Sequence, residues 1–434
     1  MTTGGDQEAL SAIGEYGAPL AAYAATGQLR CGDGQTQSCR CHCGQLRDGN
    51  VILLCYMNDF VPLDDQQVVG FSGTDNQGNR LAAELLDDLA YLPEVQDYGQ
   101  YAAYRARELR VVCDDAARAP GRLRFGVTNL RFASTSTLTT RNEEGVLSSV
   151  VRVLPLQLAG PGGVWSLSIR PTGDQDRVVQ GLVTNRGIDV TGEIVVESAP
   201  TSDLAVARQL VTDLCFLLSI ARGTKVQWIY VDEYGADGRV LRRTHCNHIT
   251  RRFGPLEPLD HRPTAADDTR RFLEAGYEEF VKKAAGFRLR TGLVDAYLDA
   301  KSEGNFLEVR GVKLAVVVEM FKSIFLETPA GKLAPKKPFL QVLKKLCTYL
   351  GLNVEGTEVR LFVECRNTLV HGCRFYVDGG PPAKKKKLPP RPNPTDEFLF
   401  LVSFVDRLFL RLLGYKGKFL DWGRYPNVEA GVLQ

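Results

Sequence analysis

The chain has 434 residues, of which 44% are hydrophobic and 24% charged, a composition typical of a globular protein with roughly two or three domains. The formal net charge of +2 excludes a polycation, so any contact with nucleic acid has to be a local patch. No signal sequence follows Met1, and no apolar stretch is long enough to cross a bilayer, so we expect a cytoplasmic protein without membrane contact. The 11 cysteines are odd in number and several lie in apolar runs, which indicates reduced, buried thiols.

The chain begins with a predicted helix over 8–25, interrupted by a glycine, and enters a strand at 27–30. A cysteine-rich segment follows, with His42 inside it: Cys31, Cys39, Cys41 and Cys43. Its alternate spacing puts three of the thiols on one face of a strand, whereas structural zinc sites usually take pairs about two to four residues apart with a distant second pair. No second pair follows, and Cys55 would have to serve alone. Strand thiols are therefore favoured over zinc.

The sequence up to residue 253 reads as β-rich. The predicted strands are 50–57, 68–71, 123–132, 146–158, 164–169, 178–183 and 188–196, followed by a hairpin over 225–234 and 239–247. Two segments are predicted to be helical: 81–92, and a long packing helix that Ser202-Asp203 opens, that runs to about residue 220 and that Gly223 closes. The region has no Walker loop, Rossmann glycine fingerprint or nucleophile elbow. His245 and His248 have no carboxylate close by in sequence, so we interpret them as hairpin polar residues rather than metal ligands.

Residues 254–267, with three prolines and mixed charge, are predicted to form a linker. Everything after it has helical periodicity. The predicted helices are 266–286, 289–303, 306–326, 339–350, one ending near 372, and 397–413. The third is almost wholly apolar, which places it at the centre of a bundle or in a dimer interface.

A narrow polar seam marks the helix that ends near residue 372. We expect Thr357 to cap its start and Gly372 to end it. Glu364, Asn367 and His371 then fall on one stripe, and the long side chain of Arg366 can swing toward it. A guanidinium can hold a phosphate, and an imidazole can transfer protons. The two groups side by side suit chemistry on a phosphodiester, and this chemistry needs no metal. The structural alternative is that Arg366 and His371 are helix-end cations that satisfy the last carbonyls.

The sequence Arg366-Asn367-x3-His371 resembles the Arg-x4-6-His motif of the HEPN superfamily, whose members are often metal-independent ribonucleases. The asparagine directly after the arginine is the commoner form in that family. By position, the resemblance implies catalytic roles for Arg366 and His371 and a supporting role for Asn367, whereas Glu364 is added from helix geometry. One branch of the superfamily has a modified tyrosine where this chain has Cys373, so membership of that branch is not expected.

The order of the two halves is similar to ApeA-like phage-defence proteins. The implied fold class is α+β, with a β-rich sensing or regulatory domain over 1–253, a linker over 254–267 and an all-α HEPN bundle over 268–434. The resemblance implies cleavage of phage or host RNA by 2′-hydroxyl attack, without cofactor or metal, in abortive infection. One motif helix offers a single imidazole, whereas such cleavage benefits from an acid and a base, so we expect a homodimer through the helical domain. A phage trigger would act on the N-terminal domain. The alternative is a non-catalytic HEPN module that binds nucleotide or RNA, or scaffolds an assembly.

A Pro/Lys-rich loop over 378–394 interrupts the predicted bundle. Its basic residues are Lys384, Lys385, Lys386, Lys387 and Arg391. Because the prolines keep this loop extended, the ammonium groups are displayed just after His371, where they could attract an RNA backbone. A solvated loop that only aids solubility remains the alternative.

Overall fold

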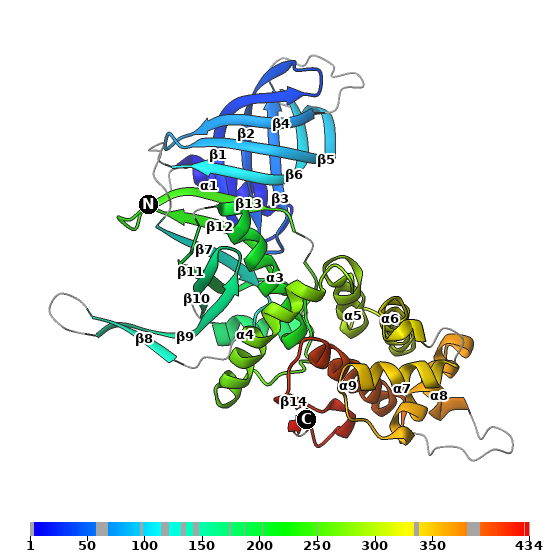
Figure 1. Cartoon of the computed structure of the whole chain (residues 1–434). Helices are drawn as coiled ribbons and strands as arrows, with labels where there is room; N and C mark the ends of the chain where they lie inside the picture. The colour runs from blue at the N-terminus through cyan, green and yellow to red at the C-terminus, as the bar shows by residue number, and fades with distance from the viewer. Residues whose placement is uncertain are drawn as a thin grey trace.

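The structure is a computed structural model. It describes residues 4–57, 68–95, 99–113, 121–131, 136–141, 147–172, 175–185, 187–201, 203–248, 250–333, 338–379, 391–428 and 430–433. Both strands and helices are abundant, and the β-rich part precedes the helical part, which confirms the α+β class (Figure 1).

A closed barrel occupies one end of the molecule (Figure 1). Its strands are β1 (Pro19–Cys31), β2 (Thr36–Leu46), β3 (Val51–Met57), β4 (Val68–Asp75), β5 (Arg80–Val95) and β6 (Gly99–Val112). They are antiparallel in the order β3-β2-β1-β4-β5-β6, and β3 pairs back onto β6 to close the ring. Helix α1 (Gly4–Gly14) packs on the outside through Ile13, next to Leu46 and Ile52. Closure leaves the barrel strands without a free edge along the β3–β6 pairing.

The second sheet continues from the barrel through the pairing of β13 with the end of β6. Its order is β13-β12-β7-β11-β10-β9-β8. The strands are β7 (Arg122–Thr128), β8 (Ser136–Arg141), β9 (Leu147–Gly160), β10 (Gly163–Pro171), β11 (Val190–Ser198), β12 (Gln227–Tyr234) and β13 (Val240–Cys246). Helix α3 (Leu204–Arg222) packs on this sheet, capped by Asp203 at its start and by Gly223 in the left-handed conformation at its end. Both caps match the sequence prediction.

Among the described helices, α3 is the one whose length and composition would allow it to cross a membrane. Most of its apolar window is buried inside the protein, against the second sheet and the helix that follows.

The helical part lies at the opposite end from the barrel (Figure 1). Its helices are α4 (Ala266–Lys283), α5 (Val294–Lys301) after a π-helical turn at Leu289–Leu293, α6 (Leu307–Glu327), α7 (Phe339–Tyr349), α8 (Gly356–Gly372) and α9 (Pro394–Leu412). A small ribbon of β14 (Lys418–Leu420) and β15 (Ala430–Val432) follows. The prediction that everything after the linker is helical is therefore wrong for these residues, which pair as antiparallel strands. A fully buried ion pair joins two of the helices, with Lys301 Nζ 2.8 Å from Asp406 Oδ1 and both groups bonded to the hydroxyl of Tyr297. Burial lowers the pKa of Lys301 and raises the pKa of Asp406.

The segment predicted as a linker is packed into the protein. Leu256, Glu257 and Leu259 are buried, and the amide of Leu259 donates to the carbonyl of Ala221. One hydrophobic core runs from the second sheet through α3 into the bundle. The segment therefore differs from a solvated spacer, and the domain boundaries drawn from the sequence stay predictions.

Three predicted elements are wrong. Residues 81–92 form part of strand β5, residues 178–183 lie inside helix α2 (Gln175–Asn185), and the first predicted helix ends at Gly14, after which the chain enters β1. The helix formers Leu81 to Leu86 are held in the strand by pairing with β4 and β6, which overrides their intrinsic preference.

Candidate functional site

Helix α8 carries the predicted motif, and its ends differ slightly from expectation. Glu355 rather than Thr357 occupies the N-cap position, and Cys373 rather than Gly372 takes the left-handed conformation, with φ of 49°. Val359, Phe362 and other apolar residues of α8 are buried, so the helix is fixed by its apolar face. The polar seam lies on the remaining surface.

Arg366 is held by two oxygen acceptors. Its Nη1 donates to Asn367 Oδ1 at 2.9 Å, and its Nη2 donates to Glu319 Oε1 of α6 at 2.5 Å. The guanidinium also lies over the ring of Phe339, 5.1 Å from its centroid. The Arg366 side chain retains 17% exposure, and its Nε is buried without a hydrogen-bond partner. The group is therefore oriented and partly desolvated while remaining reachable from solvent.

Close packing of α6 against α8 brings Glu319 to this position. Gly311 of α6 is buried, and a Cβ there would lie 3.1 Å from the methyl groups of Leu369. Glycine lets the two helices approach at this crossing. From the contact between Gly311 and Leu369, α6 advances to Glu319 while α8 goes back to Arg366, so the two helices run in opposite directions where this ion pair forms.

Asn367 lies between Arg366 and His371 along α8 and accepts a hydrogen bond from Arg366. Residues 366 and 371 are roughly 140° apart around an ideal helix, and therefore point away from each other by position alone. The hydrogen bond to Asn367 draws the guanidinium to the side of Asn367, and His371 stands one turn further along that same side. The His371 side chain is exposed, and among the described residues it has no hydrogen bond or ion pair. Its imidazole is therefore accessible to solvent.

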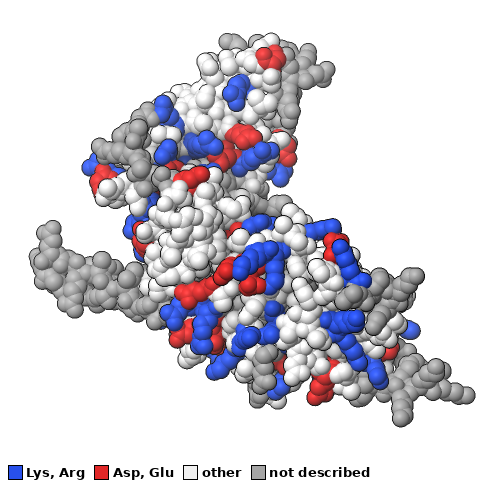
Figure 2. Space-filling view, viewed as in Figure 1, with Lys and Arg blue, Asp and Glu red and all other residues white. Residues whose placement is uncertain are grey.

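Two exposed arginines extend the seam. Arg360 precedes Glu364 by one turn on α8, and Arg374 follows the helix end. Neither has an acidic partner within the described part of the chain. Charges of both signs are interspersed over the face in Figure 2, in keeping with the small net charge. Among the described residues, Arg360 and Arg374 are therefore cations without an acidic partner beside the motif. Their positive charge is available to attract an anionic backbone.

The remaining predicted residues are not all brought together. Glu364 is half-buried, and no contact of its carboxylate with Arg366, Asn367 or His371 is found among the described residues. Arg391 is half-buried and lies over the ring of Phe400, 4.6 Å from its centroid. The predicted RNA-binding lysines 384–387 lie outside the described residues.

Glu319 is the site residue that the sequence reasoning missed. It lies 47 residues before Arg366, so no local spacing connects the two. A signal was available, because Glu319 is an acidic residue inside the almost wholly apolar run from Val316 to Phe321. A carboxylate in such a helix needs a partner.

The cysteines of the predicted weak zinc candidate do not assemble a zinc cage. Cys39, Cys41 and Cys43 share one buried face of β2, as their spacing predicts. Among the described residues, however, the one set of three ligand atoms within 4.8 Å of each other contains no cysteine. A tetrahedral thiolate site is not preformed.

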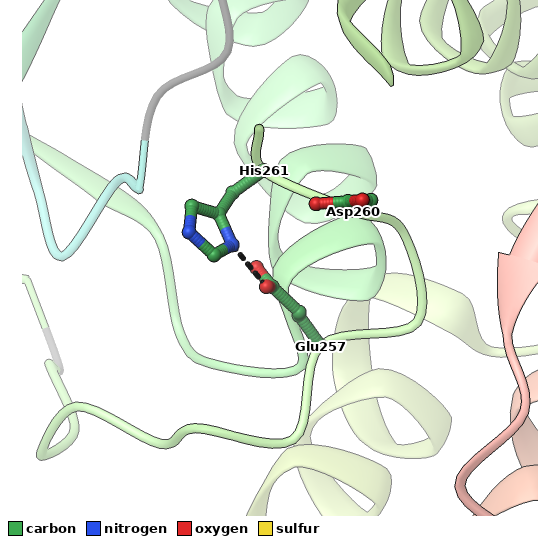
Figure 3. A group of neighbouring side chains, drawn as sticks. All are labelled: Glu257, Asp260 and His261. Carbon is green, nitrogen blue, oxygen red and sulfur yellow. Dashed lines mark hydrogen bonds and ion pairs between the residues drawn. The ribbon is translucent and has the colours of Figure 1, made fainter. Parts of the chain in front are cut away.

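That set consists of Glu257, Asp260 and His261, in the segment before α4 (Figure 3). Glu257 is buried, bonds His261, and lies 3.7 Å from Arg131 and 3.9 Å from Arg222. Burial acts to raise the pKa of Asp260, but hydrogen bonds and charge from Arg262 outweigh it and hold the pKa below its usual range. Guanidinium groups already supply positive charge here, so the cluster is an ion-pair network rather than a cation site.

His245 is a satisfied buried residue. Its Nδ1 bonds Gln45 Oε1 at 2.8 Å, and its Nε2 bonds the hydroxyl of Tyr23 at 2.9 Å. Burial and the charge of Arg243 lower the pKa of His245 to about 3. His248 packs edge-on against Trp228, with ring centroids 4.5 Å apart. The hydrogen bonds of His245 agree with its interpretation as a polar residue of the hairpin, whereas His248 Nε2 is buried without a hydrogen-bond partner among the described residues.

Comparison with known proteins gives no relative. The chain matches no protein-family model, no curated protein and no solved structure. The arrangement of Arg366, Asn367, Glu319 and His371 therefore has to be interpreted from its own chemistry.

Proposed function

We propose that the protein is a HEPN-type, metal-independent endoribonuclease that cleaves RNA through attack of the ribose 2′-hydroxyl. The observation that carries the proposal is the guanidinium of Arg366, oriented by Asn367 and Glu319, on the same helix end as the exposed His371. An arginine fork stabilises charge on phosphoryl oxygens, and an imidazole transfers protons near neutral pH.

In this reaction His371 takes the proton of the 2′-hydroxyl or gives one to the departing 5′-oxygen. The 2′-oxygen forms a bond to phosphorus, and the bond from phosphorus to the 5′-oxygen breaks. The products are a cyclic 2′,3′-phosphate and a 5′-hydroxyl end, with no net change in oxidation state. Arg366 holds the non-bridging oxygens while negative charge grows on them.

A homodimer follows from the same proposal. One α8 supplies a single imidazole, whereas this cleavage gains from both an acid and a base. Apolar side chains remain exposed on the two helices: Phe306 at the N-cap of α6 is 82% exposed, Val316 on α6 46%, and Val370 on α8 40%. Pairing two chains through α6 and α8 would cover these residues and bring two copies of His371 together.

The defence role is the broadest part of the proposal. The barrel and second sheet would sense a phage trigger, and the activated bundle would degrade phage or host RNA and arrest the cell. The rival is a non-catalytic HEPN module that uses Arg366 to bind RNA or nucleotide. The half-buried position of Arg366 and its pairing with Glu319 are compatible with this rival.

The deciding experiment is incubation of the pure protein with total RNA in EDTA, followed by mapping of the new ends. We expect cyclic 2′,3′-phosphate and 5′-hydroxyl ends from the wild type and none from His371→Ala. RNA binding without cleavage by the wild type would favour the rival. Cleavage that stops in EDTA and returns with Mg²⁺ would reject the mechanism. Mixing inactive Arg366→Ala and His371→Ala proteins tests the dimer, because subunit exchange would rebuild one intact set of groups across the interface.

A further inference from the structure

The interior of the barrel contains a concentration of sulfur that the proposed ribonuclease function does not use. Five sulfur-containing residues of β2 and β3 belong to one hydrophobic core cluster, and each is at most 7% exposed: Cys39, Cys41, Cys43, Cys55 and Met57. All four cysteines are free thiols. Sulfur side chains usually act as small core hydrophobes, but here they adjoin one another across a strand pair.

The closest two thiols face each other directly. Cys41 on β2 is the register partner of Cys55 on β3, and their Sγ atoms are 3.7 Å apart. Cys39 and Cys43 flank Cys41 at alternate positions, so their side chains are on the same inner face. Met57 follows Cys55 by two residues, and continuing the register past the Arg40–Tyr56 pair puts it opposite Cys39. Two rungs on the inner face, separated by the Arg40–Tyr56 pair, therefore carry sulfur on both strands.

The donor set selects the kind of metal. Thiolate and thioether ligands are soft and favour Cu(I), Zn(II) or iron–sulfur clusters over hard cations. Zinc needs a tetrahedral cage of four donors, and the described thiols do not form even a set of three within 4.8 Å. A close pair of thiols with further sulfur nearby fits a monovalent d¹⁰ ion, which is stable with few ligands. The separation of 3.7 Å lets a single ion bridge both sulfurs with small side-chain adjustments.

We propose that Cys41 and Cys55 form a buried Cu(I) site inside the barrel, with Cys39 and Met57 as additional sulfur donors. Binding exchanges protons for metal: Cu(I) forms two copper–sulfur bonds, the two thiols release their protons to solvent, and no electron is transferred. The complex carries one net negative charge, one fewer than the two thiolates would carry without the ion, so the metal offsets part of the cost of burying them. The copper site does not depend on RNA cleavage. It gives the β-rich half of the chain a metal ligand.

The test is an anaerobic titration of the reduced, full-length protein with Cu(I) held by bicinchoninate, whose colour reports the competition. We expect the wild type to withdraw a single Cu(I) ion per chain. Cys41→Ala and Cys55→Ala should lose this uptake. Cys215→Ala, which removes a buried thiol of α3 outside the barrel, should retain it. No uptake by the wild type, or equal uptake by Cys41→Ala, would overturn the proposal.

Footprinting of the wild type keeps the test decisive if the barrel variants fail to fold. Bound Cu(I) should protect Cys41 and Cys55 from alkylation during brief exposure to denaturant, while Cys215 and Cys347 react as they do without metal. Loss of two thiols without bound copper would mean a Cys41–Cys55 disulfide instead, and would also overturn the copper site.

Discussion

The Nη2 atom of Arg366 on α8 lies 2.5 Å from Oε1 of Glu319 on α6. Glu319 also bonds Lys322 one turn further along its own helix, and the ammonium of Lys322 lies 5.0 Å from the centroid of the Phe339 ring. Arg366 stacks on the same ring. The arginine of the motif is therefore part of an ion-pair cluster built from three helices, and its position depends on how those helices pack.

The motif residues give the first prediction. Arg366→Ala and His371→Ala should each abolish RNA cleavage, because one removes the proposed phosphate-binding fork and the other the proposed proton-transferring group. Both variants should stay folded, since Arg366 is partly exposed and His371 exposed. Cleavage of labelled RNA and circular dichroism melting would measure the two effects. Arg239→Ala, in the hairpin between β12 and β13, is the control and should cleave normally. Wild-type cleavage by either motif variant contradicts the assignment.

Glu319 gives the second prediction. Its carboxylate competes with a phosphate for Arg366, so Glu319→Gln should tighten RNA binding by about fivefold, the equivalent of roughly 1 kcal/mol. The rate of cleavage at saturating RNA should fall, because the charged partner that orients the guanidinium is lost. Binding measured by fluorescence anisotropy, together with single-turnover cleavage, separates the two effects. Asp267→Gln, which removes an exposed carboxylate paired with Arg270, is the control. Weaker binding by Glu319→Gln would show that the carboxylate supports the substrate rather than competing with it.

The basic loop gives the third prediction. Replacing lysines 384–387 by glutamine should weaken RNA binding without changing the chemical step. The slope of the logarithm of the binding constant against the logarithm of the salt concentration should become less steep by up to roughly 3. Binding measured across a range of salt concentrations gives the slope. A variant with Arg239→Gln and Arg271→Gln removes exposed charges elsewhere and should leave the slope nearly unchanged. An unchanged slope in the loop variant would identify the loop as a solubility feature.

The buried pair in the bundle gives the fourth prediction. Lys301→Met should lower the free energy of unfolding by about 3–5 kcal/mol, because Asp406 is left as an uncompensated buried acid. The double variant Lys301→Met/Asp406→Asn should recover much of the loss, since the amide still accepts from Tyr297 and carries no charge. Urea unfolding measures both. A single variant within about 1 kcal/mol of wild type would show that the pair contributes little.

The pKa of His245 gives the fifth prediction. Its folded pKa of about 3 lies below the unfolded value of about 6.5, so the unfolded state binds more protons between these values. Its contribution to stability is complete above pH 6.5 and is lost as the pH falls toward 3. His245→Gln should therefore reduce the loss of unfolding free energy between pH 6.5 and pH 5 by about 2 kcal/mol. His371→Gln, at an exposed position, should leave this loss as in the wild type. Equal pH dependence in wild type and His245→Gln would contradict the burial argument.

The sequence by itself determined what local periodicity controls. The inward face of Cys39, Cys41 and Cys43 follows from a repeat of two residues, and the helices of the C-terminal half follow from a repeat of about 3.6. The caps of α3 follow from residue type, because Asp203 accepts a hydrogen bond and Gly223 adopts the left-handed conformation. The position of Asn367 and His371 on one side of α8 also follows from the helical repeat.

Tertiary structure decided what depends on partners far away in sequence. Strand β5 contains good helix formers, yet pairing with β4 and β6 makes it a strand, and the β-branched run at Val178 and Val179 lies in helix α2. Closure of the barrel pairs Val51 of β3 with Ala106 of β6, and no local sequence pattern predicts this contact. Glu319 reaches Arg366 only because α6 and α8 pack closely at Gly311. Strand pairing and helix packing are set by which surfaces bury one another, and that depends on the whole chain.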